Sequence, residues 1–277
     1  MTINCKGNLI DFDTPKIMGI LNITPDSFYD GGKYQSDKHI LHQTEDMLSQ
    51  GATFIDVGAY SSRPGADDIS IEKEQSRLLP VLDLLTKHFG DDILISVDTF
   101  RSLVAEKALQ HGACMINDIS AGLLDPEMMD VIAKFQVPYI MMHMKGNPQT
   151  MKSLAQYDNL IVEVKQYFSQ RLNLAKQKGI NDCILDPGFG FAKTIDHNFE
   201  MLDKFELFKD FELPILCGIS RKSMIYKTLN TTADQALNGT TALHALALYK
   251  GANILRVHDV KEAKECVGLL ERLKQNI

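Results

Sequence analysis

The chain has 277 residues, of which 44% are hydrophobic and 23% charged, a composition typical of a globular protein. With 29 Lys and Arg against 36 Asp and Glu, its net charge of −7 argues against a general nucleic-acid binder, although a local basic patch could still bind a small anion. Five cysteines without a CxxC pair indicate reduced, mostly buried thiols in a cytoplasmic protein and exclude a zinc ribbon. Residues 1–13 do not look like a signal peptide, and no apolar run is long enough to predict a transmembrane helix.

Apolar runs alternate with amphipathic stretches along the whole chain. The runs have the near-continuous hydrophobicity of parallel strands that are covered on both sides. The predicted strands are 16–23, 54–59, 93–99, 115–119, 139–144, 183–187, 215–220 and 254–258. The predicted helices are 38–50, 71–88, 103–111, 126–135, 160–178, 198–208, 240–250 and 260–275.

Eight strand–helix units predict an α/β fold, a single (β/α)8 TIM barrel that occupies residues 1–277 as one domain with a short N-terminal extension of about 15 residues. An open, doubly wound sheet is the alternative. That fold usually carries GxGxxG after its first strand, whereas here the first strand ends in Asn22-Ile-Thr-Pro-Asp-Ser.

Polar residues follow every one of the eight predicted strands. In a TIM barrel these positions meet at one mouth, where active sites lie. The residues are Asn22, Ser61, Ser62, Arg63, Asp98, Asn117, Asp118, His143, Asp186, Ser220, Arg221, Lys222, Arg256 and His258. We therefore expect an active site at this mouth.

Four of these residues suit a flat heterocycle that carries paired N–H donors and a carbonyl: Asp98, Asn117, Asp186 and Lys222. A carboxylate can accept two parallel hydrogen bonds from such an edge, and a lysine can donate to a ring oxygen. The alternative is that Asp98 and Asp186 only cap the helices that follow them.

A second group suits a phosphorylated substrate. Arg63 and Arg256 could bind phosphate oxygens with their guanidinium forks, and His258 could add a donor. Asn22 could give one ligand to Mg²⁺ held mainly by substrate phosphates and water. Alternatively, Arg63 is a surface arginine. No cluster in the sequence looks like a metal site built from protein ligands alone.

The motifs at the strand ends resemble those of the dihydropteroate synthase family, and the resemblance extends from about residue 16 to 262. They are Asn22-Ile-Thr-Pro-Asp-Ser-Phe, Ser61-Ser62-Arg63-Pro64-Gly65, Ser96-Val97-Asp98-Thr99, Asn117-Asp118-Ile119, Met142-His143-Met144, Asp186-Pro187-Gly188-Phe189-Gly190-Phe191, Ser220-Arg221-Lys222-Ser223 and Arg256-Val257-His258-Asp259. The resemblance implies a transferase of folate biosynthesis that is a target of sulfonamides. It would join 6-hydroxymethyl-7,8-dihydropterin diphosphate to p-aminobenzoate with Mg²⁺, as a homodimer.

Carried over by position, the resemblance assigns three sets of residues. The pterin would be held by Asp98, Asn117, Asp186 and Lys222, and the diphosphate by Ser62, Arg63, Arg256 and His258, with Asn22 on Mg²⁺. The p-aminobenzoate pocket would be shaped by Pro64, Phe191 and Ser223. Tyr60 stands where the family often has glutamate, which bears on the affinity for p-aminobenzoate and sulfonamides.

We expect an S_N1-like reaction, because the electron-rich pterin can stabilise a cationic methylene while the charged diphosphate departs. Asp98, Asp186, Lys222, Arg63 and His258 would be the catalytic set. Two alternatives would bind a pterin in the same way: a methyltetrahydrofolate:corrinoid methyltransferase and a non-catalytic pterin-binding paralogue. The methyltransferase would not need the diphosphate-binding residues.

Overall fold

The computed structural model describes residues 1–23, 32–61 and 68–274. Eight parallel strands form one sheet in the order β8-β7-β6-β5-β4-β3-β10-β9, and a parallel bridge between Leu185 and Ile215 joins its two edges. The strands are β3 (Lys16–Asn22), β4 (Phe54–Gly58), β5 (Ile95–Asp98), β6 (Met115–Asp118), β7 (Tyr139–Met142), β8 (Cys183–Asp186), β9 (Leu216–Cys217) and β10 (Ile254–Val257).

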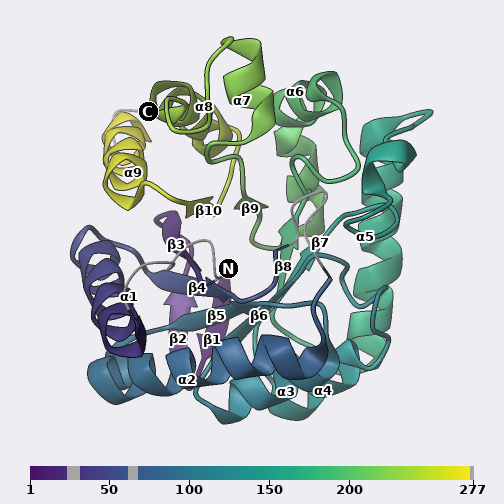
Figure 1. Cartoon of the computed structure of the whole chain (residues 1–277). Helices are drawn as coiled ribbons and strands as arrows, with labels where there is room; N and C mark the ends of the chain where they lie inside the picture. Colours follow the sequence, from purple (N-terminus) through teal and green to yellow (C-terminus); the bar gives the residue numbers. More distant parts are fainter. Residues whose placement is uncertain (24–31, 62–67, 275–277) are drawn as a thin grey trace.

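Helices surround the strands in chain order, as Figure 1 shows, which confirms the predicted (β/α)8 barrel. They are α1 (Gly32–Ser49), α2 (Ile71–Phe89), α3 (Ser102–Gln110), α4 (Met128–Phe135), α5 (Leu160–Gln177), α6 (Ile195–Asp203), α7 (Ser223–Thr228), α8 (Leu237–Tyr249) and α9 (Val260–Lys274), with 3-10 turns η2 (Gly90–Asp92), η3 (Met151–Leu154) and η4 (Phe205–Phe211).

Between α6 and α7, the structure differs from the sequence prediction in three places. Helix α6 begins at Ile195, where Thr194 and His197 form a capping box, and it gives way to η4 before residue 208. The predicted strand 215–220 is a strand only at Leu216–Cys217, with one further bridge at Ile215, because the chain then turns and reaches a left-handed backbone at Arg221. Helix α7 was not predicted, because its six residues are too few for a periodic pattern.

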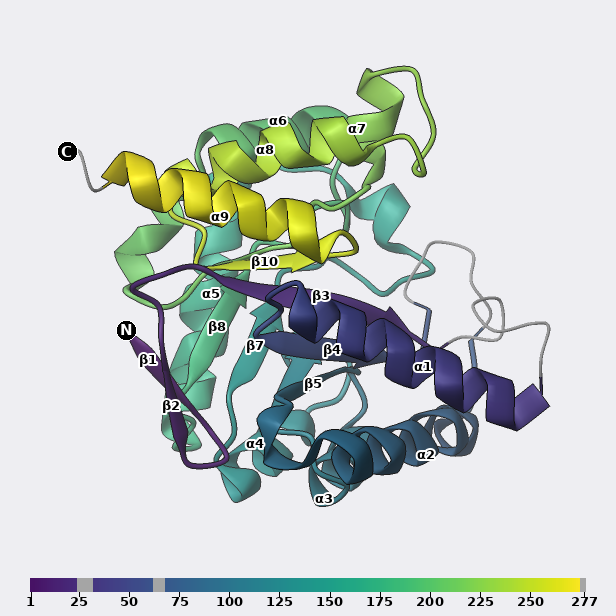
Figure 2. The same cartoon turned by 90° about the vertical axis from the view of Figure 1, so that its left-hand side faces the viewer.

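The N-terminal residues form a hairpin of β1 (Thr2–Cys5) and β2 (Asn8–Asp11), which was not predicted as strands. Lys6 and Gly7, both with positive φ, make its two-residue turn. Figure 2 shows the hairpin at the end of the barrel from which the strands start. There Ile3, Cys5 and Phe12 pack against the apolar inner ends of the strands, and Asn4 donates a backbone hydrogen bond to Asp182.

Alternation along the strands divides the buried residues into two layers. Residues such as Ile55, Val57 and Leu185 face the helices and belong to the main apolar core. Residues on the other face point into the barrel. They are apolar at the hairpin end, where Met18 and Phe54 lie, and polar towards the opposite end. The barrel interior therefore places its polar groups at the carboxyl ends of the strands.

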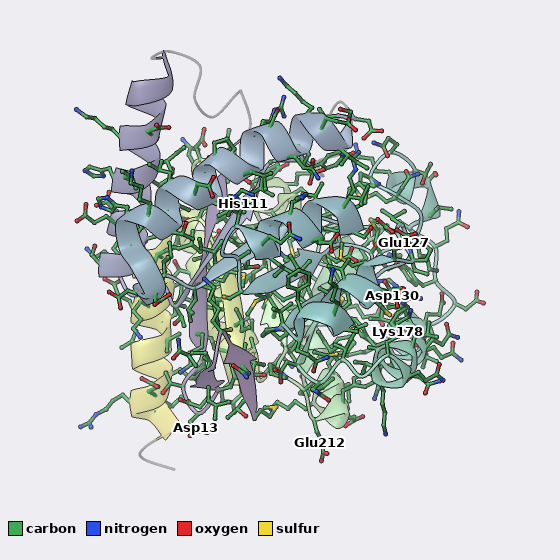
Figure 3. All side chains as sticks on the ribbon, turned by 90° about the horizontal axis from the view of Figure 1, so that it is seen from below. Asp13, His111, Glu127, Asp130, Lys178 and Glu212 are labelled. Atoms are coloured by element: carbon green, nitrogen blue, oxygen red, sulfur yellow. The ribbon has the colours of Figure 1, made fainter. Side chains whose placement is uncertain are left out.

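Charged side chains cover the outer surface of the helices. Figure 3 views the flank formed by α2, α3 and α4, and there Lys178, which follows α5, pairs with Asp130 of α4. Lys134 of α4 likewise pairs with Glu106 of α3 at 2.6 Å. In the part of the chain that the structure describes, no helix is long and apolar enough to span a membrane.

The hairpin's contribution to stability can be tested with two substitutions in the same element. Ile3→Ala removes a buried side chain and leaves a cavity at the barrel base, so we expect the free energy of unfolding to fall by about 2–5 kcal/mol. Leu9→Ala removes an exposed side chain and should change it by less than about 0.5 kcal/mol. Urea unfolding monitored by circular dichroism measures both, and equal values would show that the hairpin does not close the core.

Candidate active site

The buried carboxylate of Asp56 is the centre of the polar group inside the barrel. Its Oδ2 accepts hydrogen bonds from Arg256 Nε at 2.6 Å and Asn117 Nδ2 at 3.1 Å, and its Oδ1 accepts one from Ser96 Oγ at 2.6 Å. Sequence reasoning missed Asp56 because it lies two residues before a strand end. A charge within the apolar run Phe54-Ile-Asp-Val-Gly was the signal that could have identified it.

Arg256 links Asp56 to Asp98, since its Nη2 donates to Asp98 Oδ2 at 2.8 Å. Burial raises the pKa of Asp98 to about 7, although the Arg256 charge opposes this shift. Burial also disfavours the charge of Arg256, but Asp56 and Asp98 keep the pKa of its guanidinium above the ordinary value. Together, these residues form a charged network that extends across the barrel from β10 to β4 and β5.

The register of the sheet brings three predicted site residues into one row. Asn22 pairs with Gly58, Gly58 with Asp98, and Asp98 with Asn117. A Cβ atom at Gly58 would lie 3.6 Å from Asp98 Cβ and 3.7 Å from Asn22 Oδ1. A side chain here would touch both polar residues at van der Waals distance, so glycine leaves a gap of about one methyl group between them.

Asp186 and Lys222 lie on the opposite side of the mouth. Asp186 ends β8, and its Oδ1 accepts the backbone N–H of Gly188 at 2.8 Å. Lys222 precedes α7, donates to the carbonyl of Phe189, and places its Nζ 4.9 Å from the centre of the Phe191 ring.

Burial shifts the pKa values of Asp186 and Lys222 in the directions that favour the neutral forms of these side chains. The pKa of Asp186 is raised by burial, against the opposing charges of Lys222 and Arg256. The pKa of Lys222 is lowered by burial to about 8, and Asp186 opposes that shift. A bound substrate could therefore favour either the charged or the neutral form of Asp186 and of Lys222.

Neither aspartate serves as a helix cap. Helix α3 has Arg101 at its N-cap position, and Ser102 N bonds to Asp125 instead. Helix α6 has Thr194 as its N-cap. The alternative that Asp98 and Asp186 cap the following helices is therefore wrong.

Three polar residues near the strand ends point away from the mouth. Asp118 faces the helices, where it accepts hydrogen bonds from Tyr139 Oη and Gly122 N, both at 2.7 Å. Arg221 makes two 2.8 Å bonds to the carboxylate of Asp259. His143 follows β7, where its ring packs against Tyr167 of α5 and contacts the buried Lys193. Strand alternation explains the first case, because Asn117 and Asp118 must face opposite ways.

The remaining predicted residues divide into described and undescribed positions. His258 is exposed after β10, with its Nδ1 3.0 Å from Ser220 Oγ, and Ser223 is the first residue of α7. Ser62, Arg63 and Pro64 lie outside the described residues. The structure does show contacts of two residues near them, Tyr60 and Asp68.

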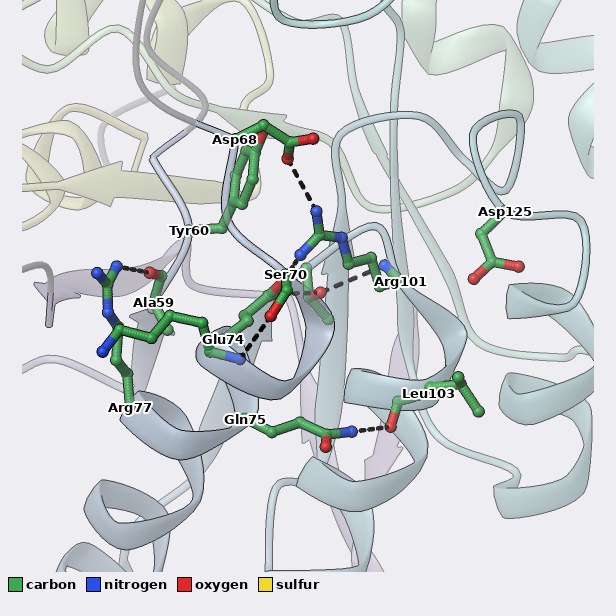
Figure 4. A network of polar contacts seen from close by, with 12 residues as sticks. Ala59, Tyr60, Asp68, Ser70, Glu74, Gln75, Arg77, Arg101, Leu103 and Asp125 are labelled. Carbon is green, nitrogen blue, oxygen red and sulfur yellow. Dashed lines mark hydrogen bonds and ion pairs between the residues drawn. The ribbon is translucent and has the colours of Figure 1, made fainter.

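Arg101 contacts Tyr60 and Asp68, two described residues on either side of positions 62–67. Its Nη2 bonds to Asp68 at 2.9 Å, and its guanidinium carbon lies 5.1 Å from the centre of the Tyr60 ring. Figure 4 shows this cluster, in which Arg101 also bonds to the buried Glu74 at 2.9 Å. Burial raises the pKa of Glu74, while Thr99 and Arg101 oppose the shift. Tyr60 thus belongs to a polar cluster beside the mouth.

The described residues contain no group of three His, Cys, Asp or Glu that could hold a metal ion. Asn22 could give a single ligand through its amide oxygen, which lies at the end of β3 beside Gly58. A magnesium ion bound mostly by substrate phosphates and water needs only one or two protein oxygens. The donor set is therefore compatible with such an ion.

The model of the pterin binding enzyme family matches residues 18–258 of the chain. The dihydropteroate synthase of Escherichia coli K12 is 41% identical over 273 residues, covering 98% of this chain and 96% of the relative. The corresponding Synechocystis enzyme is 45% identical over 260 residues, covering 93% and 89%.

Solved structures of dihydropteroate synthases are also similar to the chain. The Yersinia pestis dihydropteroate synthase with a sulfonamide drug complex matches with a TM-score of 0.92 and 39% identity, covering 99% of this chain and all of that one. The Xanthomonas albilineans enzyme with 4-aminobenzoic acid matches with a TM-score of 0.91 and 34% identity, covering 99% and 98%. These matches do not favour the methyltransferase or the non-catalytic alternative. The chain belongs to the pterin-binding enzyme family and, within it, to the dihydropteroate synthases, which are transferases of folate biosynthesis.

Proposed function

We propose that the chain joins 6-hydroxymethyl-7,8-dihydropterin diphosphate to p-aminobenzoate and releases diphosphate. The observation that carries this proposal is the charged network around Asp56, which holds Asp98 and Asn117 beside Arg256 at the mouth. Such a site offers acceptors for the N–H groups of a pterin next to a cation for a phosphate.

Pterin recognition is assigned to Asp98, Asn117, Asp186 and Lys222. The carboxylates accept hydrogen bonds from the amino-pyrimidine edge, while Asn117 and Lys222 can donate to its acceptors. Asn117 already donates one Nδ2 hydrogen to Asp56, which fixes the orientation of its amide and leaves the second N–H and Oδ1 for a ligand. The site is therefore pre-organised for a ligand with a defined donor and acceptor pattern.

Diphosphate binding is assigned to Ser62, Arg63, Arg256 and His258. Arg256 uses Nε and Nη2 for Asp56 and Asp98, so Nη1 is the nitrogen available for a phosphate oxygen. Mg²⁺, with Asn22 as a single protein ligand, would neutralise charge on the diphosphate when bound. Pro64, Phe191 and Ser223 would border the aryl amine.

The reaction follows from these assignments. The bond between the pterin methylene carbon and the diphosphate oxygen breaks first, and the electron pair leaves with diphosphate. The electron-rich pterin stabilises the methylene cation beside Asp98 and Asp186, and Arg63, Arg256 and His258 stabilise the developing charge on the leaving group. The aryl amine nitrogen then forms the new bond and loses a proton to water. Neutral at pH 7, the amine needs no strong base.

We also propose a homodimer, a cytoplasmic location and a single domain over residues 1–277. The exposed apolar side chains of Leu246 and Tyr249 on α8 and Leu269 on α9 would suit burial against a second copy. All five cysteines are free and buried, in keeping with a reducing compartment. The hairpin shares an apolar cluster with the barrel strands, which favours one domain.

The activity is tested by mixing the purified chain with the dihydropterin diphosphate, p-aminobenzoate and Mg²⁺ and measuring release of diphosphate. We expect release only when all three are present, together with dihydropteroate. Pterin binding without turnover would contradict the proposed reaction and favour a non-catalytic pterin-binding protein.

Asp98→Asn tests pterin recognition without changing the size of the side chain. It replaces one acceptor oxygen by an N–H₂ group, so a pterin donor loses its partner and the affinity should fall about 10- to 100-fold. Calorimetry with a pterin that lacks diphosphate measures this loss. Asp130→Asn, on the outer surface, is the matched control, and equal affinities in the two variants would remove Asp98 from the pterin site.

Arg256→Lys tests the diphosphate assignment while keeping a positive charge beside the buried Asp56. A lysine has a single nitrogen and cannot reproduce the separate contacts made by the nitrogens of a guanidinium fork, so kcat/KM should fall about 100-fold. Binding of the pterin without diphosphate should change far less. Comparable losses in both measurements would place Arg256 in pterin recognition instead.

A further inference from the structure

Lys193 is a buried lysine that the proposed reaction does not use. It lies between β8 and α6 and is only 8% exposed. Its Nζ is 2.9 Å from His143 Nδ1, 3.0 Å from the carbonyl of Gly188 and 3.1 Å from the carbonyl of Phe191. An ammonium group has three N–H donors, so these contacts match its full hydrogen-bonding capacity.

His143 is suited to accept the first of these bonds. Burial, with the charge of Lys193, holds the pKa of His143 well below its ordinary value. The imidazole is therefore neutral at pH 7, and Nδ1 can accept a hydrogen bond when the proton is on Nε2. The ring packs edge-on against Tyr167, with centres 4.9 Å apart, which fixes its position.

The two carbonyls belong to the segment that follows Asp186, and other contacts hold the same segment. Gly188 donates its N–H to Asp186, and Lys222 donates to the carbonyl of Phe189. A Cβ at Gly188 would lie 2.2 Å from the carbonyl oxygen of His143, so the segment lies directly against the end of β7. Lys193 thus binds this segment from behind, while Lys222 binds it from the mouth.

The charge on Lys193 is costly, because burial lowers its pKa to about 7 despite the opposing charge of Asp186. An apolar side chain of similar length could fill the same space without that cost, but it would leave three buried acceptors without a donor. A lysine here is better explained by the backbone groups it orders than by packing. Those groups lead directly to Phe191.

We propose that Lys193 is a positioning residue that fixes residues 188–191 and thereby the Phe191 ring against which p-aminobenzoate binds. This inference rests on the proposed function. Of the four residues assigned to the pterin, Asp186 and Lys222 contact this segment, whereas Asp98 and Asn117 have their own support from Asp56 and Arg256. Loss of Lys193 should therefore affect the aryl amine more than the pterin. The two substrates therefore separate this role from general destabilisation.

The test compares Lys193→Met with Lys193→Gln and the wild type. Met removes all three donors at similar length, so KM for p-aminobenzoate should rise about tenfold or more, while KM for the pterin diphosphate changes less than about threefold. Gln keeps two N–H donors and should give an intermediate KM. Lys204→Met, at a surface pair with Glu200, is the matched control and should leave both constants unchanged.

Binding of a pterin alone, measured by calorimetry, establishes whether each variant is folded and retains its pterin site. Unchanged KM values in folded Lys193→Met would overturn the positioning role, as would an equal rise for both substrates. If Lys193→Met does not bind pterin, the comparison of Lys193→Gln with the wild type decides on the same criterion. Failure of the wild type to form dihydropteroate would instead contradict the proposed function.

Discussion

The pairing of Arg256 with two buried carboxylates is the interaction on which the rest of the site depends. Asp56 lies inside the barrel without access to water, where an uncompensated charge would be costly. Arg256 compensates that charge, and Asp56 in turn orients Asn117. The same guanidinium holds Asp98, so the residues assigned to the pterin and to the diphosphate are joined by one cation. Substitution of Asp56 or Asp98 would therefore disturb both the residues assigned to the pterin and those assigned to the diphosphate.

The sequence predicted most of the fold because parallel strands in a barrel have a strong signature. Each is buried on both sides, so eight apolar runs stand out against the amphipathic helices between them. Elements that depend on few local residues could not be predicted in this way. The four-residue strands of the hairpin and the six-residue α7 are too short for a clear period, and their stability comes from contacts with distant parts of the chain.

The candidate site was predicted to the extent that its residues end strands. That rule identified Asp98, Asn117 and Asp186, but it also included Asp118, which faces the helices. Direction depends on the register of each strand, and one residue of shift exchanges the two faces. Asp56 was missed for the opposite reason, since it lies within a strand and acts through Asn117 and Arg256. A search for charges on the inner face of each strand would have found it.

Cationic side chains, of which Lys193 is buried and Arg101 and Lys222 are half-buried, contact segments beside the site. Arg101 binds Asp68 and Glu74 beside β4, and Lys193 and Lys222 bind backbone carbonyls after β8. A segment that lies outside the strands and helices has no ladder partner for its backbone carbonyls, so these carbonyls need donors from elsewhere. A long cationic side chain supplies several donors from one anchored position. The barrel thus combines an apolar base with loops whose conformation depends on contacts to charged side chains. Loss of one of these cations should therefore alter the loops at the catalytic end more than it alters the packing of the base.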